Sequence, residues 1–295
     1  MNDGYFSWRK MRNKDKDIFP AEDMLRDLEK DYPCAAARFL SREPSKDPVW
    51  ILKGKNGELS ALIINSKSTV LPVFCAENFV AKNGKKDMPN PKFLGGFFQL
   101  KRIHSVQGIK EEVIFMEDAV KQFGREISDI FDYDLMSMDQ INAQRTDSGS
   151  ISGLILRAPR MTDLDALAPL QAAYEHEEVL HKGSVFSPAA SRVNLAKIIS
   201  GGKILAAEVN GRLVGKINVS GTSFTKYVVG GVYIHPDFRS QGIAGKMAYQ
   251  FIASLTGDGM GVSLYVKKGN TAARKLYDRL GFKVVNDYRI TYFYD

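Results

Sequence analysis

The sequence has few cysteines and no long apolar run. It contains 2 cysteines among 295 residues, Cys34 and Cys75, which are too few for a disulfide framework and match no zinc spacing. We expect both to be buried free thiols in a reducing cytoplasm. No apolar run approaches the about 18 residues that a membrane span requires, and the N-terminal stretch MNDGYFSWRKMRNKDKD is charged where a secretory signal would be apolar. These absences predict a cytoplasmic protein with no membrane partner.

Motifs for metal binding and covalent catalysis are also lacking. The 4 histidines stand at no metal-ligand spacing with Cys, Asp or Glu, so no metal is expected. Among them, His104 is interpreted as structural, and His235 is expected to turn towards solvent beside Pro236. No Gly-x-Ser-x-Gly or Cys–His arrangement is present, so the sequence does not indicate an acyl-enzyme intermediate.

The first half of the chain has no excess of positive charge. Residues 1–150 carry 23 basic and 23 acidic residues, so the net charge of +7 arises entirely in residues 151–295. A basic half favours a polyanionic ligand through attraction and steering. Nucleic acid would also be attracted, but no helix-turn-helix pattern or aromatic–basic platform is present. No specific nucleic-acid partner is therefore expected.

The length of the chain suggests two domains. A polar stretch rich in small residues, 140–153, is the natural linker, which gives domains of residues 1–150 and 151–295. Residues 1–20 are expected to form a loosely packed arm. For the rest of the first half, the pattern predicts helices at 22–31, 33–40 and 113–123, strands at 48–52, 59–64, 69–74 and 131–138, a loop at 82–91 and an ambiguous segment at 93–103.

The second half shows the same kinds of signal. Thr162 and Asn270 are expected to cap two helices, and Gly201-Gly202 to end another. Asn210-Gly211 is a strong signal for a tight hairpin turn. Strands are predicted at 154–158, 203–209, 214–220, 227–234, 261–266 and 283–294.

Residues 228–245, VVGGVYIHPDFRSQGIAG, organise the second half. The first part is rich in β-branched and aromatic residues and predicts a strand that ends at Pro236, which has no N–H to donate. A helix then opens near Gly242, where the small Ala244 and Gly245 keep side chains clear of the first-turn amides. Those amides lack partners within the helix and lie at the positive end of its dipole. The turn is therefore suited to cradle a pyrophosphate.

Three segments of the second half together resemble the GCN5-related N-acetyltransferases, the GNAT family. The pattern Arg239-x-x-Gly242-x-Ala244 after a strand is similar to motif A of that family. A strand at 261–266 and the stretch NTAARKLYDRLGF at 270–282 resemble the family's closing signature. The resemblance covers about residues 155–295. The first half has a similar order of elements, but its turn at 105–108 lacks motif A, as in the degenerate N-terminal half of tandem GNAT proteins.

The resemblance implies a fold of the α/β (α+β) class with two tandem GNAT-like domains. Each would have a mixed, mostly antiparallel twisted sheet flanked by helices, with a V-shaped splay in the C-terminal sheet. The N-terminal domain would serve as scaffold or as one wall of the acceptor site, and the C-terminal domain would be catalytic. Monomer and homodimer remain open.

The resemblance also implies acetyl-CoA as co-substrate and assigns residues to it. The backbone of Val232, Tyr233 and Ile234 would bind the pantetheine arm and polarise the thioester carbonyl, and Asn270 would contact the cofactor near the thioester. The pyrophosphate would lie on the turn formed by Arg239, Ser240, Gln241, Gly242, Ile243, Ala244 and Gly245.

Catalysis would require an acid and a base. The resemblance gives Tyr277 the role of acid towards the departing CoA thiolate, which is reasonable for a phenol with a pKa near ~10. Glu177 or Glu178 is the candidate base for the attacking amine, although an acidic pair is also compatible with a solvated surface.

These residues predict direct transfer of acetyl from acetyl-CoA to a primary amine in a ternary complex. The acceptor would be a small-molecule amine or a peptide amine. Two alternatives remain open from the sequence: a non-catalytic module that senses CoA thioesters, and a transferase of the glycine N-acyltransferase-like type that uses another acyl-CoA.

Overall fold

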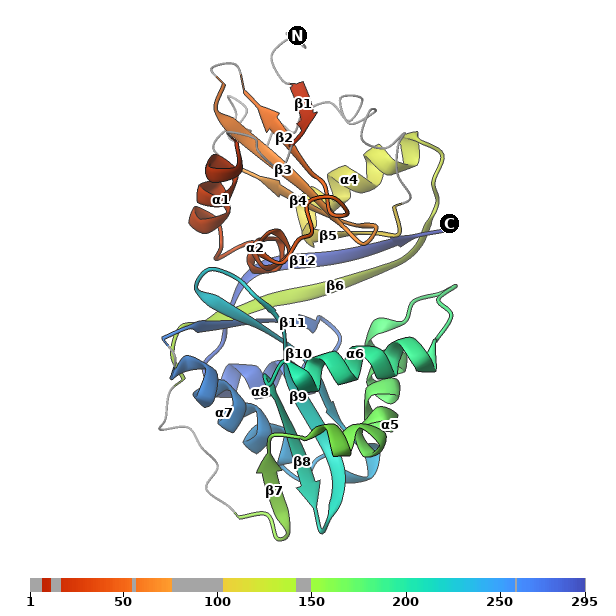
Figure 1. The fold of residues 1–295 in the computed structure, drawn as a ribbon, viewed down its shortest axis with the longest axis vertical. Coiled ribbons are helices and arrows are strands. Elements are labelled where there is room, and N and C mark those ends of the chain that lie inside the picture. Colours follow the sequence, from red (N-terminus) through yellow and green to blue (C-terminus); the bar gives the residue numbers. More distant parts are fainter. Residues whose placement is uncertain are drawn as a thin grey trace. The chain divides into compact units, whose positions relative to one another are not determined.

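The protein folds as two compact units, shown as a ribbon in Figure 1. The structure is a computed structural model and describes residues 7–11, 17–54, 57–75, 103–141, 150–257 and 259–294. The first unit comprises Met1–Leu135 and Val285–Asp295, and the second comprises Met136–Val284. The expected boundary at residue 150 therefore differs from the observed division in two places. The strand Ile127–Met138 begins in the first unit and ends in the second. The last strand of the chain, Lys283–Phe293, begins in the second unit and ends in the first.

The first unit is built on a mostly antiparallel sheet in the order β1-β2-β3-β4-β5-β12-β6, in which β4 and β5 run parallel. Residues 82–91 and most of 93–103, for which a loop and an ambiguous segment were expected, lie outside the described residues. Its elements are β1 (Ser7–Lys10), α1 (Ile18–Asp27), α2 (Pro33–Leu40), β2 (Val49–Lys53), β3 (Leu59–Ser66), β4 (Thr69–Phe74), β5 (Ser105–Ile109), α4 (Lys110–Gln122), and the parts of β6 (Ile127–Met138) and β12 (Lys283–Phe293) that belong to this unit.

Two expectations for the first unit need correction. Part of the expected arm is strand β1, whose residues Ser7 to Lys10 pair antiparallel with β2. Residues 105–108, expected to be a turn equivalent to motif A, are strand β5. By topology, β5 corresponds to β11 of the second unit, because each is the parallel partner of the strand before it. Residues 105–108 are therefore not the counterpart of the motif A turn.

Helix α4 stabilises the first unit by covering one face of its sheet. Its residues Val113, Met116 and Val120 are fully buried and pack against Ile63 and Val106 of the strands. The helical spacing of these apolar residues explains why this segment folds as an amphipathic helix. Helix α1 contacts β3, and helix α2 contacts both β3 and β4.

The second unit has the order β11-β10-β9-β8-β7, with the end of β6 beside β11. Only β10 and β11 are parallel among the pairs of this sheet whose register the structure describes. Its elements are β7 (Leu154–Arg157), α5 (Leu164–Tyr174), a π-helical turn (Glu175–Val179), α6 (Pro188–Ser200), β8 (Ile204–Val209), β9 (Arg212–Thr222), β10 (Lys226–Ile234), α7 (Ile243–Thr256), β11 (Gly261–Lys267) and α8 (Thr271–Leu280).

Helices cover both faces of this second sheet (Figure 1). Helices α7 and α8 share one apolar cluster with the sheet, in which Met247, Phe251 and Phe282 are buried. Helices α5 and α6 form a smaller cluster on the other face through Leu167, Leu195 and neighbouring residues. The mixed, mostly antiparallel α/β fold expected for each domain is confirmed.

Local signals in the second half give mixed results. The hairpin at Asn210-Gly211 is confirmed, with both residues at positive φ. The cap at Asn270 is also confirmed, because its side chain accepts from the Ala273 N–H at 3.1 Å. The cap at Thr162 is wrong. Thr162 lies inside the short 3-10 turn Met161–Asp163, whose N-cap is Arg160, and the Asp163 side chain accepts from the Arg160 N–H at 2.7 Å. Helix α5 begins after Asp163, whose side chain makes no capping hydrogen bond to it.

The parallel pair β10–β11 opens into a splay, as expected. Pairing runs from Lys226–Gly261 to Val229–Leu264 and ends there in the described strands, although β10 continues to Ile234 and β11 to Lys267. In the described part of the chain, no helix is long and apolar enough to cross a membrane.

Candidate functional site

A bulge in β10 lies where β10 leaves β11. Gly230 pairs with Asn218 of β9, and the next pair is Tyr233 with Lys216, so β10 has one extra residue at this point. Gly231 adopts a φ of 61°, which favours glycine. A Cβ there would lie 2.0 Å from the Asn218 Oδ1 atom. The bulge therefore requires glycine at position 231 for two independent reasons.

The turn between β10 and α7 exposes a helix N-terminus suited to an anion. Gly242 precedes the helix with a φ of 79°, and Ser240 is also left-handed. No acidic residue stands in the first turn, and no side chain in the described part of the molecule caps it. Ile243 is buried and fixes the helix to the sheet. The first-turn amides of Ala244 and its neighbours thus fit a polyanion such as a pyrophosphate.

The side chains of the turn hold its shape. Arg239 donates from Nε to the Ile234 carbonyl at 2.9 Å, and its guanidinium lies over the Tyr233 ring. Gln241 donates from Nε2 to the Asp237 carbonyl at 3.1 Å. Because these side chains are used within the protein, the backbone amides of the turn are its main donors for an anion.

Arg239 also forms an ion pair with Glu177, one of the two candidate bases. The Arg239 Nη2 atom lies 2.9 Å from Oε2 of Glu177, and the Tyr233 hydroxyl donates to Oε1 at 2.7 Å. The hydrogen bond from Tyr233, followed by that from Arg239, holds the pKa of Glu177 below its usual range. A carboxylate stabilised in this way is a weak proton acceptor, so the geometry disfavours Glu177 as base while this pair persists.

Glu178, the other candidate base, is paired as well. Its Oε2 atom lies 3.1 Å from the Lys267 Nζ atom at the end of β11. Both glutamates are carried by the π-helical turn Glu175–Val179, a rare geometry that is frequent at functional sites. The turn is thus tied to the end of β10 through Glu177 and to the end of β11 through Glu178.

Tyr277 lies on α8, in the apolar cluster that α7 and α8 share with the sheet. Its side chain is buried, and its ring packs against Phe282 with centroids 5.7 Å apart. Burial raises the pKa of its hydroxyl, and the nearby Tyr174 and Glu178 raise it further. The phenol is therefore protonated at neutral pH. This state suits a proton donor, as expected for Tyr277, and excludes a role as base.

Three polar residues that the sequence analysis did not single out gather at the bulge. Lys216 and Asn218 are buried on β9, and Tyr174 ends α5. Two signals in the sequence could have indicated them. Gly230-Gly231 inside a strand pattern suggests a bulge, and Lys216 stands between the apolar residues Val214 and Ile217 of a predicted strand.

The remaining expected contacts are placed as follows. Val232 is half-buried on the segment of β10 that has left β11, and the carbonyl of Ile234 is occupied by Arg239. Asn270 stands at the start of α8, as its cap. The described residues contain no group of three or more His, Cys, Asp or Glu side chains that could hold a metal ion.

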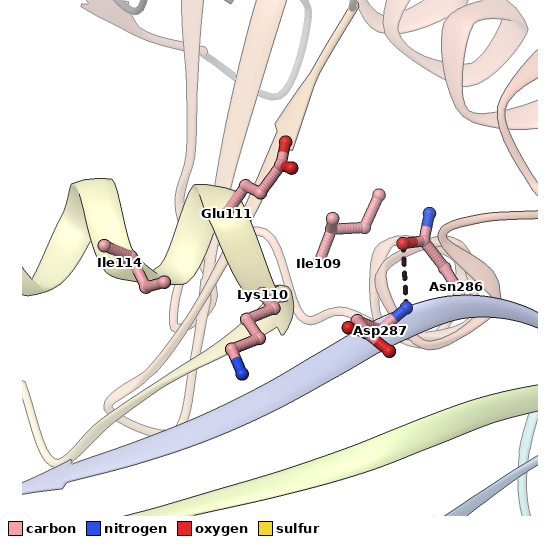
Figure 2. Close-up of a pocket in the computed structure, with 6 residues that line it drawn as sticks. All are labelled: Ile109, Lys110, Glu111, Ile114, Asn286 and Asp287. Atoms are coloured by element: carbon pink, nitrogen blue, oxygen red, sulfur yellow. Dashed lines mark hydrogen bonds between the residues drawn. The ribbon is translucent and has the colours of Figure 1, made fainter.

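The first unit contains a surface hollow of about 390 Å³ at the start of α4. Figure 2 shows its polar side chains, including Asn286, whose Oδ1 accepts from the Asp287 N–H at 2.9 Å. Glu111 and Glu112 stand in the first turn of α4, where their charge opposes binding of an anion. None of the expected site residues lines the hollow, which is formed by Ile109, Lys110, Glu111, Ile114, Asn286 and Asp287.

Comparison with known proteins agrees with the features of the second unit. Residues 170–282 match the model of the acetyltransferase (GNAT) family. The search of curated proteins gave no significant match.

Solved structures resemble nearly the whole chain. A protein from Drosophila has a TM-score of 0.64 at 12% identity, over 97% of this chain and 98% of that chain. A tandem GNAT protein from the clavulanic acid biosynthesis pathway has a TM-score of 0.60 at 12% identity, over 97% of each chain. A GCN5-related N-acetyltransferase from Sphaerobacter thermophilus has a TM-score of 0.59 at 16% identity, over 97% of this chain and 94% of that chain. At these identities the likeness shows the fold.

Proposed function

We propose, on the premise that residues 170–282 form a GNAT-family acetyltransferase domain, that this protein moves the acetyl group of acetyl-CoA to a primary amine. The observation that carries the proposal is the splay of β10 from β11, which leads directly to the unprotected N-terminus of α7. A strand edge and a helix N-terminus in sequence suit a ligand that has an extended amide-containing arm and a pyrophosphate. Cys34 and Cys75 are half-buried, where buried thiols were expected, and they are not joined in a disulfide, which agrees with a cytoplasmic location.

The backbone of the second unit would hold the acetyl-CoA. The first-turn amides from Ile243 to Gly245 would bind the pyrophosphate, and the segment from Val232 to Ile234 would face the pantetheine arm. Acetyl-CoA supplies an acyl group that is activated as a thioester. The net charge of +7 in residues 151–295 would attract this polyanion to the second half of the chain.

The reaction would proceed by direct attack. The amine nitrogen forms a bond to the acyl carbon, the carbon–sulfur bond breaks, the amine loses a proton and the thiolate receives one. Tyr277 would give the proton to the thiolate, since its raised pKa keeps it protonated. Glu178 or Glu177 would accept the amine proton once its cationic partner, Lys267 or Arg239, has been drawn to the anionic substrate.

A second candidate is a module that binds CoA thioesters without catalysis. The ion pairing of both glutamates favours it, because neither carboxylate is available as base in the observed geometry. Transfer of a longer acyl group, as in glycine N-acyltransferase-like proteins, remains a variant of the first candidate.

The first test is calorimetric titration of the full chain with acetyl-CoA and with CoA. The expected result is a single site that is lost in Gly242→Glu. Thiol release with a panel of acyl-CoAs and amines then separates the candidates. Release with at least one pair supports transfer. Binding without release from any pair supports the sensing module, and absence of binding contradicts both.

A further inference from the structure

Lys216 is a fully buried cation in the middle of a sheet. It lies on β9 between Ala206 of β8 and Tyr233 of β10, and its side chain has no solvent exposure. A buried lysine is unusual because taking its charge out of water costs free energy that an apolar residue would not cost. Burial lowers the pKa of Lys216 to about 7, and the charge of Glu175 on the π-helical turn opposes that lowering. The contacts of this lysine therefore have to offset the free-energy cost of burying its charge.

The contacts of Lys216 all converge on the bulge of β10. Its Nζ atom donates to the Gly231 carbonyl at 2.9 Å and to Asn218 Oδ1 at 3.3 Å. The same ammonium lies 4.7 Å from the centre of the Tyr174 ring. Lys216 of β9 therefore holds the Gly231 carbonyl, and the ring of Tyr174 on α5 in turn packs against the Lys216 ammonium.

This cluster lies next to the acid of the proposed reaction. Tyr174, which contacts Lys216, is close enough to Tyr277 to raise the pKa of its hydroxyl. The groups that face Lys216 are thus Tyr174 from α5, Glu175 from the π-helical turn, and the Gly231 carbonyl from β10. From β8, its neighbour is the uncharged Ala206.

We propose that Lys216 is a positioning residue for acyl transfer: together with Asn218 and Tyr174 it fixes the bulge at Gly231 and so keeps residues 232–234 apart from β11. The claim that Lys216 affects acyl transfer rests on the proposed function. The claim that Lys216 holds the bulge rests only on the geometry of the second unit. Lys216 acts through the backbone of β10.

The test compares Lys216→Met with Lys203→Met in the full chain. Lys203 is a matched control, because its Nζ atom also lies over a tyrosine ring, that of Tyr227 at 4.5 Å. It is exposed, and its Nζ donates to the Tyr227 hydroxyl at 3.2 Å and not to Gly231. Methionine has nearly the length of lysine and no charge, so both variants are expected to fold. Lys216→Met should lower kcat about 10- to 100-fold, with acetyl-CoA affinity within about threefold of the wild type. Lys203→Met should leave both unchanged.

The pH profile separates positioning from a purely structural role. The charged form of Lys216, which donates most strongly, is lost as the pH rises through about 7. The ratio of wild-type to Lys216→Met turnover should therefore be largest below pH 7 and decrease above it. A Lys216→Met variant with wild-type kcat and pH profile would overturn the proposal.

Hydrogen exchange gives a readout that does not depend on activity. Amides of residues 230–234 should exchange at least about tenfold faster in Lys216→Met than in the wild type, while those of residues 226–229 remain unchanged. Equal exchange would overturn the structural part of the proposal even if turnover falls. Faster exchange in a protein whose wild type shows no turnover would support the hold on the bulge and contradict the proposed function, so the two failures are distinguishable.

Discussion

Each unit contains a pair of parallel neighbouring strands, and the two pairs differ in the residues that follow the parallel pairing. In each, one strand is antiparallel to its predecessor and parallel to its successor: β4 with β5 in the first unit and β10 with β11 in the second. In both pairs the described parallel pairing covers only the beginning of the strands, ending at Val70–Val106 and at Val229–Leu264. Both units therefore share this topology and an early end of the parallel pairing.

The residues after the last parallel pair differ. In the first unit, β4 follows β3 without a register shift, and its Pro72 has no N–H to offer. The Pro72 ring lies 3.5 Å from the position of a Cβ on Gly108 of β5, and the hydroxyl of Tyr32 occupies the Phe74 carbonyl at 3.1 Å. The second unit has a glycine bulge surrounded by polar side chains. The comparison teaches that the shared topology does not by itself make a site, and that the bulge and its polar neighbours distinguish the second unit.

The largest expected effect tests the helix N-terminus of the second unit. Gly242→Glu should weaken binding of acetyl-CoA at least about 100-fold, because it places a carboxylate among the amides that would bind the pyrophosphate. Gly259→Glu is the matched control, since Gly259 has the same φ of 79° and is exposed after the far end of α7. Calorimetry should show near wild-type affinity for this control. If Gly242→Glu still binds CoA, the site lies elsewhere, for example in the first unit. That result would contradict the conclusion that the second unit alone carries the site.

The next effect tests the bulge with two adjacent glycines. Gly231→Ala should lower kcat about 10- to 100-fold and stability by about 1–3 kcal/mol, because its Cβ would strain a left-handed residue and approach Asn218. Gly230→Ala should stay within about 1 kcal/mol, since its Cβ would meet only Ser220, at 3.3 Å or more. Steady-state kinetics and denaturant unfolding measure both. Equal effects of the two substitutions would show that the bulge has no special role.

A pair of buried tyrosines gives a smaller contrast. Tyr277→Phe should reduce turnover about tenfold and affinity for acetyl-CoA much less, because only the proton to the thiolate is lost. Tyr32→Phe should leave turnover unchanged and cost about 1–2 kcal/mol of stability, because Tyr32 bonds to Glu112 and to the Phe74 carbonyl. Equal loss of turnover and affinity in Tyr277→Phe would argue against its role as acid.

The smallest contrast is in the pH dependence of stability. Lys216 has a folded pKa of about 7, below its ordinary 10.5, so the unfolded chain binds more protons between these values and stability rises with pH there. Asp132 of the first unit has a pKa lowered to about 2, chiefly by Arg289, so its contribution of about 1–2 kcal/mol is lost as the pH falls from 3.8 through about 2.

Unfolding midpoints of the wild type, Lys216→Met and Asp132→Asn measure these two slopes. Lys216→Met should lack the rise above pH 7, and Asp132→Asn should lack part of the loss in acid. Parallel curves for all three proteins would contradict both assignments.

The sequence was sufficient for most of the fold. Helix α2 and strand β4 were predicted with their observed bounds, because Pro33 and the apolar runs of these segments are strong local signals. The GNAT-like second half followed from three motifs in the right order. The counterpart of motif A in the first half was assigned wrongly to residues 105–108, since a short strand that runs directly into a helix has the local pattern of a strand and turn.

The site was less predictable than the fold. Motif spacing indicated Gly242 and Tyr277, but it carried no information on which cation would meet Glu177 or Glu178. Arg239 was assigned to the cofactor on its position in the motif, and the structure pairs its side chain with Glu177. Long-range partners of this kind depend on tertiary packing, which local patterns do not contain.

The return of residues 285–295 to the first unit has a consequence for the order of folding. Strand β5 pairs with β12 through Ser105–Tyr292 to Ile109–Tyr288, contacts between residues far apart in the sequence. During synthesis, β5 therefore has to wait for the second unit to be translated before its neighbour exists. Such non-local pairing slows folding and leaves an open strand edge in the meantime. A fragment ending near residue 150 would retain that edge permanently, so the two halves are a single unit of biosynthesis even though each has its own core.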